Sequence, residues 1–204
     1  MATVTISLWV LALLVFVGLA FDFMNGFHDA ANAIATVVST GVLKPHQAVA
    51  WAAFFNFIAL FIFQLKVAST VGKGIIDPTI VDHHLIFGAL LGAIAWNVVT
   101  WYYGIPSSSS HALIGGIVGA AIAKAGTDPL IGAGIMKTVA FIVISPLFGY
   151  VLGSLILVAV AWICRNKTQR RVDKWFRRLQ LVSAALYSLG HGGNDAQKTV
   201  GIIW

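Results

Sequence analysis

The chain lacks glutamate and has a single cysteine, and both features limit the classes of protein to which it can belong. Its seven acidic residues are all aspartates, and charged residues make up only 10% of the 204-residue chain, against 59% hydrophobic residues. A soluble protein of this composition could not cover its surface with polar groups. The lone Cys164 excludes an internal disulfide framework and a cysteine zinc cluster. The composition therefore predicts an all-α, polytopic helical membrane protein.

The N-terminus also lacks the basic residues that precede the apolar core of a cleavable signal peptide. Asp22 and Asn25 then interrupt the apolar run, so we expect a retained first helix rather than a leader. Because roughly 20 apolar residues cross a bilayer core, the sequence predicts further membrane spans and some shorter or interrupted segments. The expected spans are Ser7–Met24, Ala48–Val67, Leu85–Tyr103 and Met136–Cys164, and the shorter segments are Ala30–Leu43, Ser107–Ala125 and Leu179–Trp204.

Basic residues are concentrated in one segment, residues 165–178, which contains a single acid, Asp173. Basic residues beside a membrane span form the positive-inside signal, so we expect this segment to be a loop that faces the cytoplasm. Nucleic-acid binding would also use basic residues, but no soluble binding domain accompanies them, and we expect no nucleic-acid partner. The basic residues are Arg165, Lys167, Arg170, Arg171, Lys174, Arg177 and Arg178.

A polar motif occurs twice in this apolar chain, at Asn25–Asn32 and at His191–Lys198. In register, Asp29 matches Asp195, and both copies follow apolar segments. Ionisable residues at matching points of two hydrophobic segments are typical of a transporter built from repeats. We expect interrupted helices here, because non-helical backbone at membrane depth is tolerated only in cavities or protein interiors. The chain then divides into a first transmembrane repeat (1–164), the basic loop (165–178) and the start of a second repeat (179–204).

The first motif offers oxygen ligands on one helix face, because Asp29 and Asn32 are three residues apart. Their oxygens are suited to a small cation, with Asp195 as a further ligand, or to hydrogen bonds from a neighbouring helix. Histidine is the residue type suited to proton transfer near neutral pH, so His28 is a candidate proton carrier; the alternative is a hydrogen bond to a backbone carbonyl. Lys198 supplies a fixed positive charge, or it extends to the membrane interface.

Four consecutive serines follow Pro106. Proline disfavours helix in the residue before it and suits the first helical turn, so the serines are expected to begin a short helix. Free backbone N–H groups, hydroxyls and the positive end of the helix dipole then converge on one point, which favours an anion. The glycines Gly115, Gly116 and Gly119 favour close packing in a re-entrant hairpin. The alternative is a serine-rich helix cap at the membrane surface.

The motifs at 26–33, 106–111 and 191–199, in this order and with the basic segment, resemble the inorganic phosphate transporter (PiT) family. His28, where many sodium-coupled members have Asn, resembles the bacterial low-affinity branch. The resemblance implies an inverted-repeat, alternating-access symporter of the bacterial inner (plasma) membrane, with no cofactor. It also allows a homodimer. It implies phosphate or metal–phosphate as cargo and a proton, a divalent metal or sodium as the coupling cation. The implied site residues are Asn25, His28, Asp29, Asn32, Ser107, Ser108, Ser109, Ser110, Asn194, Asp195 and Lys198.

Family members continue beyond the second motif, whereas this chain ends at Trp204, so we expect the N-terminal part of a transporter with an incomplete second repeat. One alternative is a truncated product that acts only as an assembly partner. Another is a divalent-metal permease that uses His28, Asp29, His191 and Asp195 as ligands. An intramembrane serine hydrolase is disfavoured because the serines lack a Gly-x-Ser-x-Gly turn, and we expect no enzyme activity.

Overall fold

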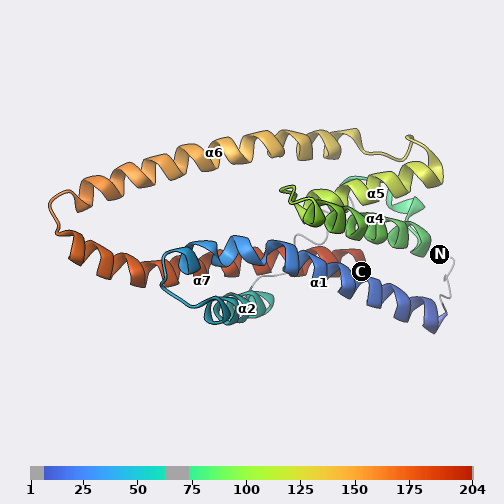
Figure 1. Ribbon diagram of the computed structural model, residues 1–204. Helices are drawn as coiled ribbons and strands as arrows, with labels where there is room; N and C mark the ends of the chain where they lie inside the picture. The colour runs from blue at the N-terminus through green and yellow to red at the C-terminus, as the bar shows by residue number, and fades with distance from the viewer. Residues whose placement is uncertain (1–6, 63–73, 204) are drawn as a thin grey trace.

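The computed structural model describes residues 7–62 and 74–203, without the side chains of residues 30 and 196–203. Within these ranges the fold is all-α, as the composition predicts, and its only β pairing is the isolated bridge between Ile76 and Leu130. Four helices, α1, α2, α4 and α6, are long and apolar enough to cross a membrane. The elements are α1 (Leu8–Ser39), α2 (Pro45–Ile62), the 3₁₀ turn η1 (Pro78–Ile80), α4 (His83–Tyr102), α5 (Ser109–Ala125), α6 (Gly132–Cys164) and α7 (Gln169–Ile203) (Figure 1).

Helix α1 is continuous through the first polar motif, which corrects the expected interruption at Asn25–Asn32. The predicted segments Ser7–Met24 and Ala30–Leu43 are therefore one helix, and α7 is likewise continuous through the second motif. Neither motif contains proline, and a single internal glycine such as Gly26 costs a helix only about 1 kcal/mol. The first motif also contains Ala30 and Ala31, and alanine is the strongest helix former. Local sequence thus favours an unbroken α1, and the polar side chains of the motif project from regular turns.

Helix α1 lies at the centre of the arrangement and contacts α2, α4 and α7. Helices α1 and α7 lie side by side and run in opposite directions, with α2 against both and the α4–α5 pair on another side of α1 (Figure 1). Phe21 of α1 is fully buried in the main apolar cluster with Leu90 of α4 and Leu113 of α5. This cluster packs α5 against α1, and Asp29 follows Phe21 further along α1. The antiparallel contact brings the two polar motifs together.

Helices α4 and α5 form the hairpin that the proline and serines predict. The chain leaves α4 through Gly104, whose φ of 64° suits glycine, and enters α5 at its N-cap, Ser108. At the opposite end, Asp82 caps α4 through the Leu85 amide (2.9 Å) and pairs with Lys124 of α5 (2.7 Å). The bond from Lys124, with the Leu85 amide, lowers the pKa of Asp82 below its usual value. Both ends of the hairpin are thus fixed by side chains.

The basic residues lie mostly in a helix, which differs from the loop expected at 165–178. The connection after α6 is short, and α7 begins at Gln169, so Arg170 to Arg178 occupy its first turns. Arginine, lysine, glutamine and leucine are strong helix formers, and no glycine or proline occurs between Gln169 and Leu189, so the helix extends backward. The preceding helix, α6, has no buried residue along its length. Its apolar surface is suited to lipid contact.

The close approach of α4 and α5 depends on Gly116 and generates a test. A Cβ at Gly116 would collide with the backbone oxygen of Ala89, whereas a Cβ at Gly115 meets nothing within 4 Å. We expect Gly116→Ala to destabilise the protein by about 1–3 kcal/mol, because the clash is with backbone. Gly115→Ala is the matched control and should be neutral or stabilising. Thermal unfolding of the two variants in detergent measures the difference, and equal midpoints would contradict this packing.

Candidate functional site

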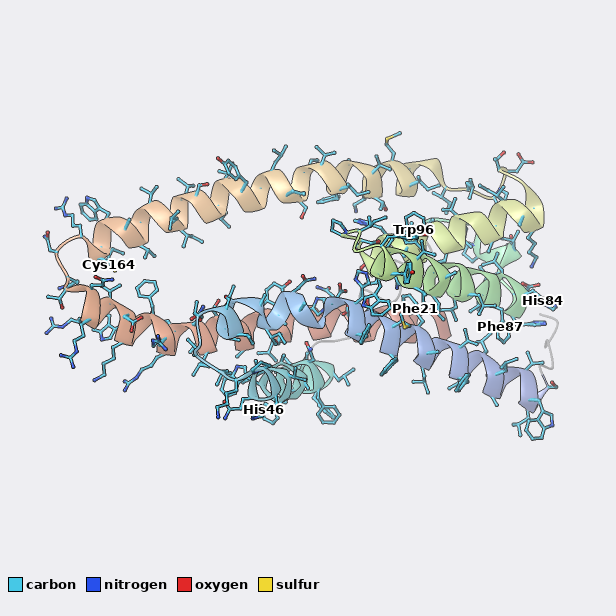
Figure 2. The ribbon with its side chains drawn as sticks, in the orientation of Figure 1. Phe21, His46, His84, Phe87, Trp96 and Cys164 are labelled. Atoms are coloured by element: carbon cyan, nitrogen blue, oxygen red, sulfur yellow. The ribbon has the colours of Figure 1, made fainter. Side chains whose placement is uncertain are left out.

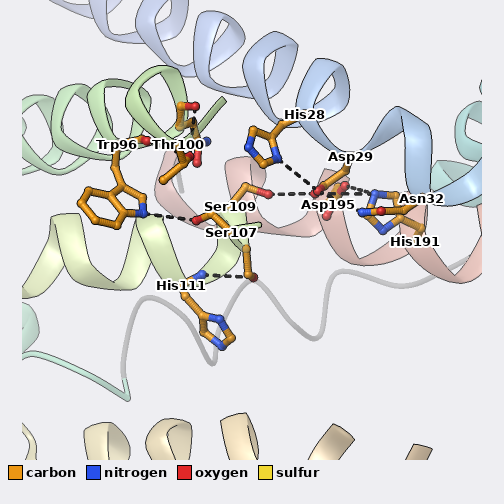
Figure 3. Close-up of polar contacts among 12 residues, drawn as sticks. His28, Asp29, Asn32, Trp96, Thr100, Ser107, Ser109, His111, His191 and Asp195 are labelled. Atoms are coloured by element: carbon orange, nitrogen blue, oxygen red, sulfur yellow. Dashed lines mark hydrogen bonds and ion pairs between the residues drawn. The ribbon is translucent and has the colours of Figure 1, made fainter. Parts of the chain in front are cut away.

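The site is built around the carboxylate of Asp29, which is only 8% exposed on α1. The Ser109 hydroxyl at the start of α5 donates to Oδ2 of Asp29 at 2.9 Å, and the Asn32 amide approaches Oδ1 at 3.5 Å (Figure 3). The Asp29–Asn32 contact confirms that these two side chains share a helix face. A buried carboxylate needs such partners, because leaving it without them carries the full cost of desolvation. Asp29 thus joins α1 to the serine-rich end of the hairpin.

His191 joins the two copies of the polar motif. Its Nε2 atom lies 2.9 Å from Oδ2 of Asp195 on the same helix and 3.9 Å from Oδ2 of Asp29 on α1. The Tyr187 ring stacks against the imidazole with centroids 6.1 Å apart. Two carboxylates held this close repel each other when both are ionised, and a protonated histidine or a cation between them relieves the repulsion. The pair Asp29 and Asp195 is therefore a site for positive charge.

A cavity of about 490 Å³ opens beside this carboxylate pair. The serines of the α5 start reach it, and the N-terminus of α5 supplies backbone N–H groups and the positive end of its dipole. The wall at the start of α5 therefore offers hydrogen-bond donors for an anion, and the wall formed by α1 and α7 offers carboxylate oxygens for a cation. The lining residues are Asp29, Asn32, Ser107, Ser108, Ser110, Leu113, Ile114, His191, Asn194 and Asp195.

A divalent cation also has candidate ligands here. One ligand atom each from Asp29, His191 and Asp195 lies within 4.8 Å of the others, and this is the only such group of three in the described part of the chain. Carboxylate oxygen and imidazole nitrogen together suit zinc and similar metals. Asn32, an expected cation ligand, lines the same cavity beside them. The donor atoms of these residues are thus of the types that a divalent metal ion takes as ligands.

Three of the expected site residues, Asn25, His28 and Ser109, lie outside the cavity lining. Ser109 holds Asp29 but does not line the cavity, and Asn25 is buried with its Oδ1 unpartnered, also outside the lining. His28 lies outside the lining too, with its Nδ1 3.8 Å from Oδ1 of Asp29. Asn194 lines the cavity, but its amide donates to the Gly190 carbonyl at 3.0 Å. The side chain of Lys198 lies outside the described residues.

His191 is absent from the expected transporter site and has a role in the alternative readings, such as that of a metal permease. The signal was present, because His191 and Asp195 are four residues apart and share one face of a helix. This spacing brings the two side chains together only if the helix continues through the second motif. The expectation of an interrupted segment there therefore gave no reason to pair His191 with Asp195.

The fold and the site define a helical membrane protein in which two repeated acidic motifs share one cavity with a serine-capped helix. The sequence model of the phosphate transporter family matches residues 25–204, and the chain belongs to this family. A probable low-affinity inorganic phosphate transporter of Rhizobium meliloti is 60% identical over 98% of this chain. One of Streptomyces halstedii is 48% identical over 91% of this chain and 87% of its own length. The low-affinity inorganic phosphate transporter PitB of Escherichia coli is 34% identical over 91% of this chain.

A solved structure described as the sodium-dependent phosphate transporter shares the fold. It superposes with a TM-score of 0.81 at 22% identity, over 96% of this chain and 66% of that one. The present chain spans 60% of the Rhizobium protein and 43% of PitB. The family and the multi-pass helical fold therefore hold for this chain, which corresponds to part of the length of several relatives.

The bond between Ser109 and Asp29 predicts a selective loss of stability. Ser109→Ala leaves the buried Oδ2 of Asp29 without its hydroxyl donor, which should lower stability by about 1–3 kcal/mol. Ser107→Ala is the matched control, because the partly exposed Ser107 hydroxyl only accepts from the Trp96 ring nitrogen at 3.2 Å. Chemical unfolding of both variants in detergent gives the two values. A Ser107 loss as large as the Ser109 loss would contradict the central place of the Asp29 bond.

Proposed function

We propose that this chain supplies the substrate and ion centre of an inorganic phosphate transporter that moves phosphate with a cation by alternating access. The observation that carries the proposal is the contact among Ser109, Asp29 and His191, which links a serine-capped helix start to both copies of the acidic motif. Membership of the phosphate transporter family supports phosphate as the cargo. The names of the bacterial relatives support the same cargo.

Electrostatics explains why phosphate travels with a cation in this proposal. Phosphate in the cavity takes donors from Ser107, Ser108 and Ser110, yet it faces Asp29 and Asp195 across the same space. Two unit charges of like sign 4 Å apart repel by about 4 kcal/mol at an effective dielectric of 20. The bare anion is therefore excluded, and a cation beside the two carboxylates admits it. This dependence of one ligand on the other is what couples the two fluxes.

We favour a proton or a metal–phosphate complex as the coupled species, with sodium as the other candidate. His191 between the carboxylates and His28 at 3.8 Å from Asp29 supply protonatable nitrogens. The ligand triad of Asp29, His191 and Asp195 supports the uptake of a divalent metal together with phosphate. Sodium finds support only in the sodium-dependent phosphate transporter that has the same fold.

In the same proposal, α1 and α7 carry the alternating step. Their antiparallel contact places Asp29 and Asp195 on helices of opposite direction around one cavity, as opposed repeats do. We place the basic start of α7 on the cytoplasmic face of the bacterial plasma membrane, following the positive-inside rule. A phosphate ion then reaches the cavity from either side as the repeats rock about it.

The first test removes the carboxylates one at a time from the full-length transporter. Asp29→Asn should abolish uptake of labelled phosphate while surface expression stays normal, because the neutral amide no longer attracts the cation. Asp195→Asn should behave alike, since His191 joins it to the same centre. The matched control is Asp128→Asn, an exposed aspartate remote in sequence from both motifs. Wild-type uptake by the Asp29 variant at normal surface expression would remove this residue from the centre.

A second test addresses the metal. His191→Gln should weaken zinc binding at least 10-fold, because the variant loses the imidazole nitrogen, one of the three candidate ligand atoms. His46→Gln is the control, an exposed histidine at the start of α2. Zinc affinity is measured by titration of the purified chain, and phosphate uptake by the full-length transporter is measured with and without zinc. The two measurements separate transport of a metal–phosphate complex from transport of phosphate with another cation. Unchanged zinc affinity with intact phosphate uptake would leave phosphate transport standing and remove the metal–phosphate complex.

A further inference from the structure

The start of α7 has two opposed faces. Counting from Arg170, basic residues recur at spacings that return to one side of a helix, and apolar residues occupy the opposite side. The basic side has no counterpart among the acids, because the single acid of the segment, Asp173, is paired with Arg177 at 3.1 Å. The basic face is Arg170, Arg171, Lys174, Arg177 and Arg178, and the apolar face is Val172, Trp175, Phe176 and Leu179.

The rest of the protein leaves most of both faces exposed. The five basic side chains are all exposed, and Trp175 and Leu179 are 61% and 56% exposed. Buried residues on α7 begin only at Ala184, where α1 and α2 pack against the helix. For Arg170, Arg171, Lys174 and Arg178, no ion pair is seen within the described residues. The segment therefore presents unneutralised charge on one side and uncovered apolar surface on the other.

Its position puts these faces at a membrane surface. Helix α6 is a candidate span without a buried residue, and the segment follows its end at Cys164 after a short turn. Nitrogen-tipped side chains gather at this end of the molecule, beyond the labelled Cys164 (Figure 2). At the last turn of α6, the Arg165 guanidinium lies 4.9 Å from the centre of the Trp162 ring. Tryptophan and arginine at a span end are typical of the headgroup layer.

We propose that residues 165–179 form a docking surface for acidic phospholipids. The apolar side chains at the start of α7 lie at the boundary between headgroups and acyl chains, and the basic side chains bind the phosphates of anionic headgroups. Arginine suits this role because its guanidinium donates two parallel hydrogen bonds to one phosphate. Charge complementarity selects the acidic lipid over a zwitterionic one, and the exposed Trp175 selects a bilayer over a dissolved anion. The surface is independent of the phosphate cavity.

The first experiment measures lipid preference. The purified chain in neutral detergent is titrated with phosphatidylglycerol or phosphatidylcholine, and bound lipids are counted by native mass spectrometry. The double variant Arg170→Gln/Lys174→Gln should lose about 30-fold of its preference for phosphatidylglycerol, roughly 5-fold for each charge removed. The matched control, Arg170→Lys/Lys174→Arg, keeps both charges and should keep the preference. Equal preference in both double variants would overturn the proposal and leave the basic face as an insertion signal only.

A second experiment locates the lipid and does not depend on any variant folding. A photoreactive phosphatidylglycerol, added to the unmodified chain, should crosslink mainly within residues 165–182, as read by peptide mass spectrometry. Inorganic phosphate added before illumination should reduce the crosslinking no more than chloride does at equal ionic strength, because both salts then act only by screening charge. Crosslinks distributed over α2, α4 and α6 instead would overturn the proposal. Selective displacement by phosphate would also overturn it, because the face would then bind a dissolved anion.

Discussion

The buried carboxylate of Asp29 is the point on which the arrangement of the helices depends. Its partners come from α1 itself, from the start of α5 and from α7, so one side chain ties three helices together. Such a contact forms only where the helices already approach closely, and Gly116 against Ala89 and Phe21 in the main apolar cluster provide that approach. Apolar packing therefore sets the distances, and the carboxylate sets the register of the polar groups.

The cavity has hydrogen-bond donors on one part of its lining and carboxylate acceptors, including Asp29, on another. The start of α5 presents donors and the positive end of a helix dipole, and the motifs on α1 and α7 present acceptors and negative charge. Ser109 joins these two parts of the site without lining the cavity, because it stands at the start of α5 and donates its hydrogen bond to Asp29 of α1. The two walls are thus fixed against each other before any ligand arrives. Preorganised donors of this kind bind a ligand without a large ordering cost.

Much of this arrangement follows from the sequence, and the failures have identifiable causes. Composition and apolar runs predict the all-α membrane fold, and Pro106 with its serines predicts the α4–α5 hairpin. The paired motifs predict that Asp29 and Asp195 belong to one centre, and His191 lies between them. The expected helix interruptions are absent, because polar residues at membrane depth do not require unwound backbone. In α1, Ala30 and Ala31 favour the regular helix.

The basic segment differs from the expected loop for a related reason. Charge does not prevent a helix, because arginine and lysine are good helix formers, and no glycine or proline occurs between Gln169 and Leu189. Other features have no local signal at all. Ser109 donates to Asp29, whereas the neighbouring serines line the cavity. This difference depends on the rotation of α5 relative to α1, which is set by the packing of the whole hairpin.

The unbroken course of α1 through Asp29 has a consequence for how such a site changes over evolutionary time. In a regular helix the main-chain carbonyls are already engaged by amides one turn ahead, so they are poor ligands for an ion. An ion bound at Asp29, as proposed above, then takes side chains and water as its ligands. Substitutions of those side chains are therefore expected to change the ion preference of the site while the backbone stays as it is.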